Sequence, residues 1–227
     1  MKHDEGIIIA IDGPAGSGKS STAREVARRL GYRHLDSGAF YRGLTLAAIR
    51  AGIPAERWEA LNSDEISALG VGADPDDDGY RISIHGENVS DEIRSPEVNA
   101  LVSRMAALPA VRAWLLDALR RAGDVGRLVA DGRDIGTVVF PDAELKVFLV
   151  CAPEERARRR LLEQGHTRPD NEQIALEQAR LARRDSDDSS RAVAPLMRAE
   201  DAVQLDTTDL SFDDQVAAII AMAKQRS

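Results

Sequence analysis

Near its N-terminus the chain reads Gly13-Pro14-Ala15-Gly16-Ser17-Gly18-Lys19-Ser20-Ser21. Its first eight residues fit the pattern G-x-x-x-x-G-K-[ST], in which glycines let the backbone curl until successive N–H groups point at phosphate oxygens. A helix beginning at the end of such a loop adds the positive end of its dipole. We therefore expect this stretch to bind the phosphates of ATP, with Lys19 on the β- and γ-phosphates and the Ser20 hydroxyl on Mg²⁺.

The residues on either side of this stretch argue against an accidental match. Residues 6–12 form a short, mostly β-branched apolar run that ends at Asp12, which predicts a buried strand. Between Ser20 and Leu30 the apolar residues recur at helical spacing, and Gly31 is a typical helix stop. A strand, a glycine-rich loop and a helix in this order are the context that the phosphate-binding pattern requires.

The rest of the chain continues the alternation of strands and helices. Further apolar strands are predicted at 32–35, 127–130, 145–150 and 202–205, and helices at 41–50, 110–121, 154–164, 172–184 and 212–224. This order indicates an α/β fold with a parallel sheet. Residues 63–93 break the pattern, being acidic and loop-like, and the alternating stretch 80–85 within them predicts a small inserted antiparallel β-sheet.

Composition excludes several classes of protein. The 227 residues carry 30 Lys+Arg against 38 Asp+Glu, a net charge of −8, which disfavours a general nucleic-acid binder. The single cysteine, Cys151, cannot form an internal disulfide. Residues 1–5 do not resemble a signal peptide, and no apolar run is long enough to span a membrane. We expect a cytoplasmic protein, and a monomer.

The charge is unevenly distributed along the chain. Residues 59–92 hold ten acidic residues and one arginine, whereas residues 156–198 hold ten arginines and seven acids. Only four of the 30 cations are lysines. Arginine presents a planar fork that suits phosphates and the edges of bases. This asymmetry suggests that the arginines gather where anions are held.

The phosphate-binding loop does not by itself identify the reaction. A GTPase would need an Asn-Lys-x-Asp motif, and no Asn-Lys pair occurs in the chain. Motor and transporter ATPases are usually larger. A kinase that phosphorylates a small molecule fits the length best.

Four clusters of charged residues are candidates for the acceptor side, and each has an alternative explanation. Residues 36–42 end in Arg42, which could bind a phosphate or lie on a solvated helix face capped by Ser37. Residues 131–134 follow a predicted strand, where ligands bind in such sheets, but could form a surface turn with an ion pair.

The other two clusters are rich in arginine. Arg184, Asp188 and Arg191 would share one face of a continuing helix, as ligand-binding residues or as a salt-bridged helix end. Residues 154–160 contain four arginines, which could belong to a lid over the transferring phosphoryl group. Alternatively, they could form a solvated face with i,i+4 pairs to Glu154 and Glu155.

Taken together, four segments closely resemble bacterial cytidylate kinases, which are nucleoside monophosphate kinases. They read GPAGSGKSS, LDSGAFYR, ADGRDIGTVVFPDA and RRDSDDSSRAVAPL, in the order and at the spacing of that family. The resemblance covers nearly the whole chain and is weakest in the acidic insertion. Some relatives have Gly-Thr after the loop lysine where this chain has Ser20-Ser21. Since Ser20 still supplies a hydroxyl, this departure changes little.

The resemblance implies a P-loop nucleoside monophosphate kinase fold with a five-stranded parallel sheet flanked by helices. Residues 1–37 and 108–227 would form the core, and 38–107 an acceptor-binding subdomain with its β insertion at about 63–93. Residues 153–168 would form a short lid. The implied reaction, in pyrimidine nucleotide metabolism, is the phosphorylation of CMP and dCMP to CDP and dCDP by ATP, with Mg²⁺.

The resemblance also assigns roles to individual residues. Arg42 and Arg133 would hold the phosphate of CMP, and Arg156 and Arg159 would be lid arginines near the ATP phosphates. With Lys19, these four would be the catalytic residues. The acceptor site as a whole would comprise Ser37, Tyr41, Arg42, Ser103, Arg112, Arg133, Asp134, Arg184, Asp188 and Arg191. Among these, Ser103, Arg112 and Asp134 would face the cytosine, Arg184 and Asp188 the ribose, and Arg191 the base and phosphate.

The expected chemistry needs no general base, because an acceptor phosphate is already mostly dianionic at neutral pH. The four histidines, His3, His34, His85 and His166, are scattered along the sequence and suggest no histidine–carboxylate dyad. Two other hypotheses remain open at this point. One is a kinase for another nucleotide or a coenzyme precursor, and the other is a nucleotide-dependent regulator without transfer activity.

Overall fold

The computed structural model describes residues 6–76, 79–124 and 126–226. Residues 1–5, on which the expectation of no signal peptide rested, lie outside these ranges. Five strands form a parallel sheet in the order β2-β6-β1-β7-β8. They are β1 (Ile8–Asp12), β2 (Arg33–Asp36), β6 (Leu128–Gly132), β7 (Leu145–Val150) and β8 (Val203–Asp206). The predicted α/β class and five-stranded parallel sheet are confirmed.

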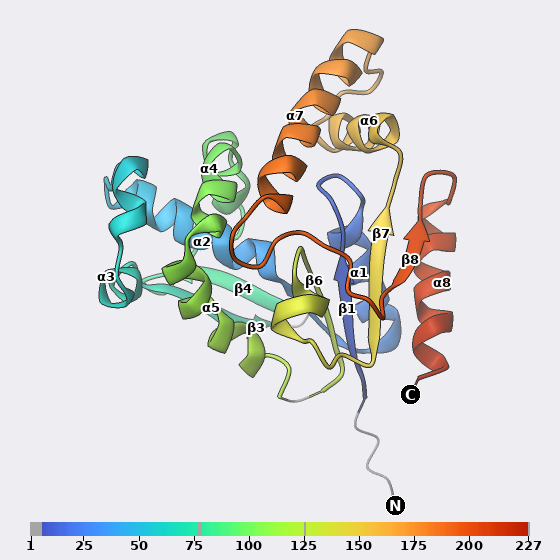
Figure 1. Cartoon of the computed structure of the whole chain (residues 1–227), viewed down its shortest axis with the longest axis horizontal. Coiled ribbons are helices and arrows are strands. Elements are labelled where there is room, and N and C mark those ends of the chain that lie inside the picture. Colours follow the sequence, from blue (N-terminus) through green and yellow to red (C-terminus); the bar gives the residue numbers. More distant parts are fainter. Residues whose placement is uncertain (1–5, 77–78, 125, 227) are drawn as a thin grey trace, which may run out of the picture.

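Helices cover both faces of this sheet (Figure 1). On one face α1 (Lys19–Leu30) and α8 (Phe212–Lys224) pack with Val26 and Ile219 against Ile9 and Ile11 of the central strand. On the other face α2 (Ser37–Arg50) and α5 (Pro109–Arg121) bury a larger apolar cluster that reaches Ala10 of the same strand. Because strand β1 is buried on both faces, its sequence is continuously apolar rather than alternating.

The acidic segment forms a second, smaller sheet with antiparallel strands in the order β3-β4-β5. These strands are β3 (Val71–Asp76), β4 (Gly79–Ile84) and β5 (Glu87–Asn88). The predicted antiparallel insertion is therefore confirmed. The loop-like reading of its beginning is wrong, because residues 63–68 form helix α3 (Ser63–Ala68), whose first turn is closed by a capping box between Asn62 and Glu65.

Two more helices complete the side of the molecule that carries this insertion. A short 3₁₀ helix, η2 (Glu92–Arg94), leads into α4 (Pro96–Ala107), which the sequence analysis did not assign. Ser95 caps α4 through the N–H of Val98, and Pro96 occupies its first turn. A proline at this position loses no helical hydrogen bond, so Ser-Pro is a start signal for this helix.

Helices α6 (Pro153–Glu163) and α7 (Asn171–Ser189) pack against each other and project from the carboxyl ends of the strands (Figure 1). Helix α7 is five residues longer at its C-terminus than the predicted 172–184. Throughout the described parts of the chain, every helix is too short or too polar to cross a membrane.

Candidate functional site

The glycine-rich loop leaves β1 and runs directly into α1. A Cβ atom on Gly13 would come within 2.5 Å of the Leu149 carbonyl oxygen, so the loop can pass β7 this closely only with glycine there. Gly18 has φ +83°, a left-handed conformation that favours glycine, and it is the N-cap of α1. The amides of the first turn of α1 are thereby left free to bind an anion.

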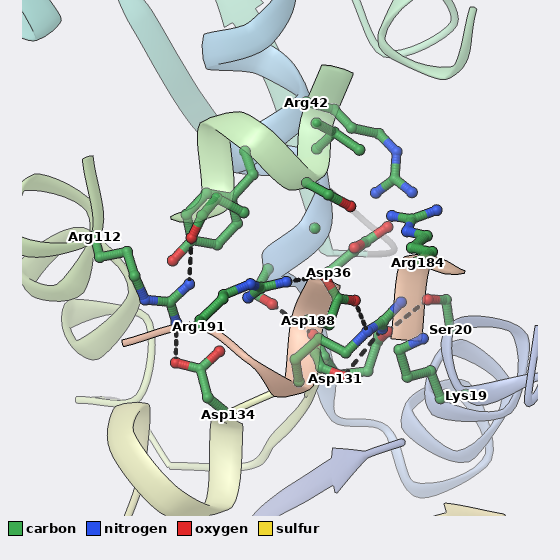
Figure 2. Close-up of a pocket in the computed structure, with 18 residues that line it drawn as sticks. Lys19, Ser20, Asp36, Arg42, Arg112, Asp131, Asp134, Arg184, Asp188 and Arg191 are labelled. Atoms are coloured by element: carbon green, nitrogen blue, oxygen red, sulfur yellow. Dashed lines mark hydrogen bonds and ion pairs between the residues drawn. The ribbon is translucent and has the colours of Figure 1, made fainter. Parts of the chain in front are cut away.

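A cavity adjoins this loop at the carboxyl ends of β1, β2 and β6, and we call it the arginine cavity (Figure 2). All ten residues that the sequence assigned to the acceptor site line it. The complete lining is Lys19, Ser20, Asp36, Ser37, Gly38, Tyr41, Arg42, Val102, Ser103, Ala106, Arg112, Asp131, Gly132, Arg133, Asp134, Arg184, Asp188 and Arg191.

Asp188 is the central acid of this cavity and is only 1% exposed. Its Oδ2 accepts a 2.8 Å hydrogen bond from Nε of Arg133, and its Oδ1 pairs with Arg191. Burial alone would raise the pKa of Asp188, but Arg133, Arg191 and Arg184 hold the pKa below its ordinary value. Asp188 is therefore an anion that fixes the positions of two guanidinium groups.

The predicted geometry of this cluster is wrong in one respect. Arg184, Asp188 and Arg191 were expected to share one face of a continuing helix, but α7 ends at Ser189. Arg191 lies two residues beyond that end and still pairs with Asp188, three residues before it. The cluster does not form a solvated helix end, since Asp188 is buried.

The cavity holds more positive charge than its own acids neutralise. Burial, followed by the proximity of Arg133, lowers the pKa of Lys19 to about 7. Burial, then Arg133 and Arg42, lowers the pKa of Arg184 to about 10. In addition, the buried Nε atom of Arg184 has no hydrogen-bond partner among the described residues. An anionic ligand such as phosphate would favour the charged form of these groups and give Arg184 a hydrogen-bond acceptor.

At the end of the cavity away from Lys19 and Ser20, polar side chains are held in place by contacts within the protein. Arg112 donates to the Ala106 carbonyl at 2.9 Å and pairs with the carboxylate of Asp134. Its guanidinium lies 5.4 Å from the centre of the Tyr41 ring, so a cation–π contact also holds it. Ser103, on α4, also lines the cavity. Figure 2 shows Arg112 and Asp134 at one end of the cavity and Lys19 and Ser20 at the other.

Two alternatives for the segment that follows β2 are wrong. Helix α2 begins at Ser37, four residues before the predicted start, and its N-cap is Asp36, which accepts from the N–H of Ala39 at 3.1 Å. The Ser37 hydroxyl instead donates to the Asp131 carbonyl at 2.8 Å. Arg42 faces the cavity and not solvent, and burial lowers its pKa.

A second cavity continues from the first along the glycine-rich loop, and we call it the loop cavity. The two cavities share Lys19, Ser20, Arg42, Arg133 and Arg184. The remaining lining of the loop cavity is Ala15, Gly16, Gly18, Ser21, Arg24, Arg94, Arg160, Glu163 and Leu181. The glycine-rich loop and the acceptor-side residues therefore border one continuous space.

Three of these arginines were not assigned to the ATP site or the acceptor site from the sequence. Arg160 comes from α6, Arg24 from α1 and Arg94 from η2, where Arg94 pairs with Asp36 at 2.9 Å. Arg160 belongs to the run of four arginines in residues 154–160 that was a candidate for a lid. Neither Arg24 nor Arg94 carried a signal beyond its charge.

Arg156 and Arg159 lie beside the glycine-rich loop but line neither cavity. Arg156 donates to the Ala15 carbonyl at 2.8 Å and pairs with Asp185, which accepts from the N–H of Ala15. Arg159 binds Glu155 at 2.9 Å and the Thr207 carbonyl at 2.7 Å. These two arginines support the loop and the start of α6. The i,i+4 pair between Arg158 and Glu154 is also present, on the exposed side of the helix.

A divalent cation can be held at the junction of the two cavities. The Ser20 hydroxyl donates to Oδ2 of Asp131, a buried carboxylate at the end of β6. Within the described ranges no group of three or more metal-ligating side chains occurs. This fits Mg²⁺ together with a nucleotide, because Mg²⁺ keeps several waters and takes phosphate oxygens along with one or two protein oxygens.

Comparison with known proteins places this site in a family. A protein-family model described as "Cytidylate kinase" matches residues 9–225. A protein named "Cytidylate kinase" from Pseudomonas paraeruginosa is 48% identical over 221 residues, which are 96% of each chain. One with the same name from Chloroherpeton thalassium is 42% identical over 222 residues, covering 96% of this chain and 93% of that protein.

One solved structure has the same fold at low sequence identity. It is the crystal structure of an uncharacterized protein from Eubacterium ventriosum, with a TM-score of 0.51 and 13% identity. The match covers 97% of this chain and 99% of that one. It bears on the fold alone.

Proposed function

We propose, because the chain belongs to the cytidylate kinase family, that it transfers the γ-phosphoryl group of ATP to CMP and dCMP, giving CDP and dCDP. The observation that carries the proposal is the continuous space bordered by the glycine-rich loop at one end and Arg112 with Asp134 at the other. An ATP-binding regulator has no need of an arginine-lined acceptor cavity beyond its phosphate-binding loop.

In this proposal the loop, with Lys19 and Arg160, binds the phosphates of ATP. Arg42 and Arg133 hold the phosphate of CMP in line with the γ-phosphorus. The acceptor phosphate is dianionic at neutral pH, so its oxygen attacks without a general base. The contribution of the protein is then positioning and charge stabilisation of the transferring group.

Ser20, with its hydroxyl held by Asp131, would bind Mg²⁺, which when bound neutralises phosphate charge. Arg184 and Asp188 would contact the ribose. Arg112, Asp134 and Ser103 would read the edge of cytosine through hydrogen bonds. A site built around such hydrogen bonds rejects bases that leave its buried polar groups unpaired.

Two segments would move when the substrates bind. Residues 38–107 would close over the nucleoside monophosphate as a subdomain, and residues 153–168 would act as a lid over ATP. In this role Arg156 would connect the lid to the loop through the Ala15 carbonyl, and Arg159 would lie close to ATP.

The base preference is tested by measuring ATP consumption with CMP, dCMP, UMP and AMP as acceptors. We expect CMP and dCMP to be the best acceptors and AMP to be the poorest. Equal rates with all four would overturn the assignment of Arg112, Asp134 and Ser103 to the cytosine.

A second expectation follows from the low pKa of Lys19. At pH 8 a group with a pKa of about 7 is mostly neutral, and ATP phosphates beside it would raise that pKa towards the ordinary value of about 10.4. Binding of ATP at pH 8 should therefore take up close to one proton. At pH 6, where Lys19 is already charged, this uptake should vanish.

Isothermal titration calorimetry in two buffers that differ in ionisation enthalpy measures this uptake. The control is the Lys19→Arg variant, whose guanidinium stays protonated and should show no uptake at pH 8. Equal binding heats for the native protein in both buffers at pH 8 would contradict the prediction.

A further inference from the structure

His34 forms a buried pair with Asp131 that the sequence did not reveal. The side chain lies on β2 and is 5% exposed, and its Nε2 is 2.8 Å from Oδ1 of Asp131 on the neighbouring strand β6. The sequence suggests no histidine–carboxylate dyad, and the fold nevertheless forms this pair. The two residues are 97 positions apart, and only the parallel pairing of β2 with β6 brings them together.

The chemistry of the pair fixes the direction of its hydrogen bond. An ionised carboxylate can only accept, so Nε2 of His34 donates to Oδ1 of Asp131. The other carboxylate oxygen, Oδ2, accepts from the Ser20 hydroxyl. Each oxygen of Asp131 thus has one donor, and the plane of the carboxylate is held from both sides. Figure 2 shows Asp131 next to Ser20 at the start of α1.

The insertion covers His34 from the other side. Strand β4 begins at Gly79, where an added Cβ would lie 2.3 Å from the carbonyl oxygen of His34. Glycine is required for this close approach, and its φ of +150° also favours glycine. The small sheet therefore packs tightly on β2 at His34. This contact fixes the backbone of β2 at the residue that carries the imidazole.

We propose that His34 is a positioning residue, which holds the Asp131 carboxylate in the orientation that accepts the hydrogen bond from the Ser20 hydroxyl. The hydroxyl fixed in this way strengthens the binding of Mg²⁺ with the nucleotide. The proposal rests on the proposed function only in taking an ATP–Mg²⁺ complex as ligand. His34 itself contacts neither metal nor substrate. It acts as outer-shell partners of metal sites generally do, by orienting a group that lies closer to the metal.

The test compares two variants by their effect on metal-dependent binding, without turnover. His34→Phe keeps an aromatic ring in the buried position but removes the donor. His34→Gln places an amide N–H near the position of Nε2 and keeps the hydrogen bond. Calorimetry gives the Kd of the β,γ-imido analogue of ATP with Mg²⁺ and with EDTA. The Kd in EDTA divided by the Kd with Mg²⁺ measures how strongly metal and nucleotide binding are coupled.

We expect His34→Phe to reduce this ratio by about tenfold while the Kd in EDTA stays within twofold. His34→Gln should restore the ratio to within threefold of the native value. In a Ser20→Ala background, His34→Phe should have no further effect on the ratio, because the hydroxyl that Asp131 serves is gone. That last comparison remains informative if His34→Phe lowers thermal stability.

Three outcomes would overturn the proposal. The first is an unchanged ratio of Kd values in His34→Phe. The second is a reduction of the ratio in His34→Gln as large as that in His34→Phe. The third is a reduction of the same size when His34→Phe is added to Ser20→Ala. None of these measurements involves CMP. Failure of the acceptor assay would therefore count against the proposed function alone, and failure of the coupling test against the role of His34 alone.

Discussion

Replacing Asp188 by alanine will lower kcat/KM for CMP by at least about thirtyfold. Asp188 is the buried partner of both Arg133 and Arg191. Without it these guanidiniums repel each other and Arg184, and they lose the geometry in which they meet the substrate. Truncating one partner of a buried, hydrogen-bonded charge pair costs about 2–5 kcal/mol, and about 1.4 kcal/mol corresponds to a factor of ten.

Two comparisons make this prediction specific. Asp187→Ala, on the same helix but on its exposed side, should change kcat/KM by less than twofold. Since Asp188 is assigned to the ribose hydroxyls, the loss for CMP should exceed the loss for dCMP, which lacks the 2′-hydroxyl. Steady-state kinetics with both acceptors measures this difference. Equal losses would show that Asp188 acts only by holding the arginines.

The same substitution should destabilise the protein. Removing one member of a buried ion pair leaves charges without a partner and typically costs about 3–5 kcal/mol. We therefore expect the free energy of unfolding of Asp188→Ala, measured with urea at pH 7, to fall by about that amount. Asp187→Ala should unfold like the native protein.

Replacing Lys19 by methionine will lower kcat by about 10²–10³-fold. Methionine keeps most of the length of the side chain but removes the charge next to the phosphates. Removing one preorganised donor from a transition-state site typically costs this much. In the structure the Lys19 Nζ lies 3.4 Å from the Pro14 carbonyl oxygen, inside the loop that it serves.

The effect should appear mainly in kcat, because the charge on the transferring group is what Lys19 stabilises. Single-turnover measurement of ADP formation at saturating ATP and CMP tests this directly. Arg24→Ala is the control, since Arg24 lines the loop cavity but not the arginine cavity, and it should lose less than tenfold. A rate for Lys19→Met within fivefold of the native rate would show that Lys19 does not stabilise the transferring phosphoryl group.

The local features of the fold could be predicted from the sequence because each depends on neighbouring residues. The strand before Gly13 is a continuous apolar run, and the helix after Lys19 has a clear apolar period. Helix α3 was missed because its six residues are too short to show a period, although Asn62 and Glu65 form a capping box. Ser37 was a plausible helix cap by residue type, but its hydroxyl bonds the Asp131 carbonyl instead.

The candidate site could be predicted as a set of residues but not as a set of contacts. Arg133 and Asp188 are 55 positions apart, and His34 and Asp131 are 97 apart. No spacing rule connects such residues, because the pairing of β2 with β6 brings His34 to Asp131, and the position of α7 at the ends of the strands brings Asp188 to Arg133. In the same way, the arginine run of α6 suggested a lid, but only the packing of α6 on the glycine-rich loop shows that Arg160 lines the cavity while Arg156 binds the Ala15 carbonyl.

The identity of the products tests the central claim most directly. The protein is incubated with ATP, CMP and Mg²⁺, and the nucleotides are separated and quantified over time. We predict that ADP and CDP form in equal amounts, with little ADP when CMP is left out. Formation of ADP without CDP would contradict the account, because the chain would then hydrolyse ATP and not transfer its phosphoryl group to CMP.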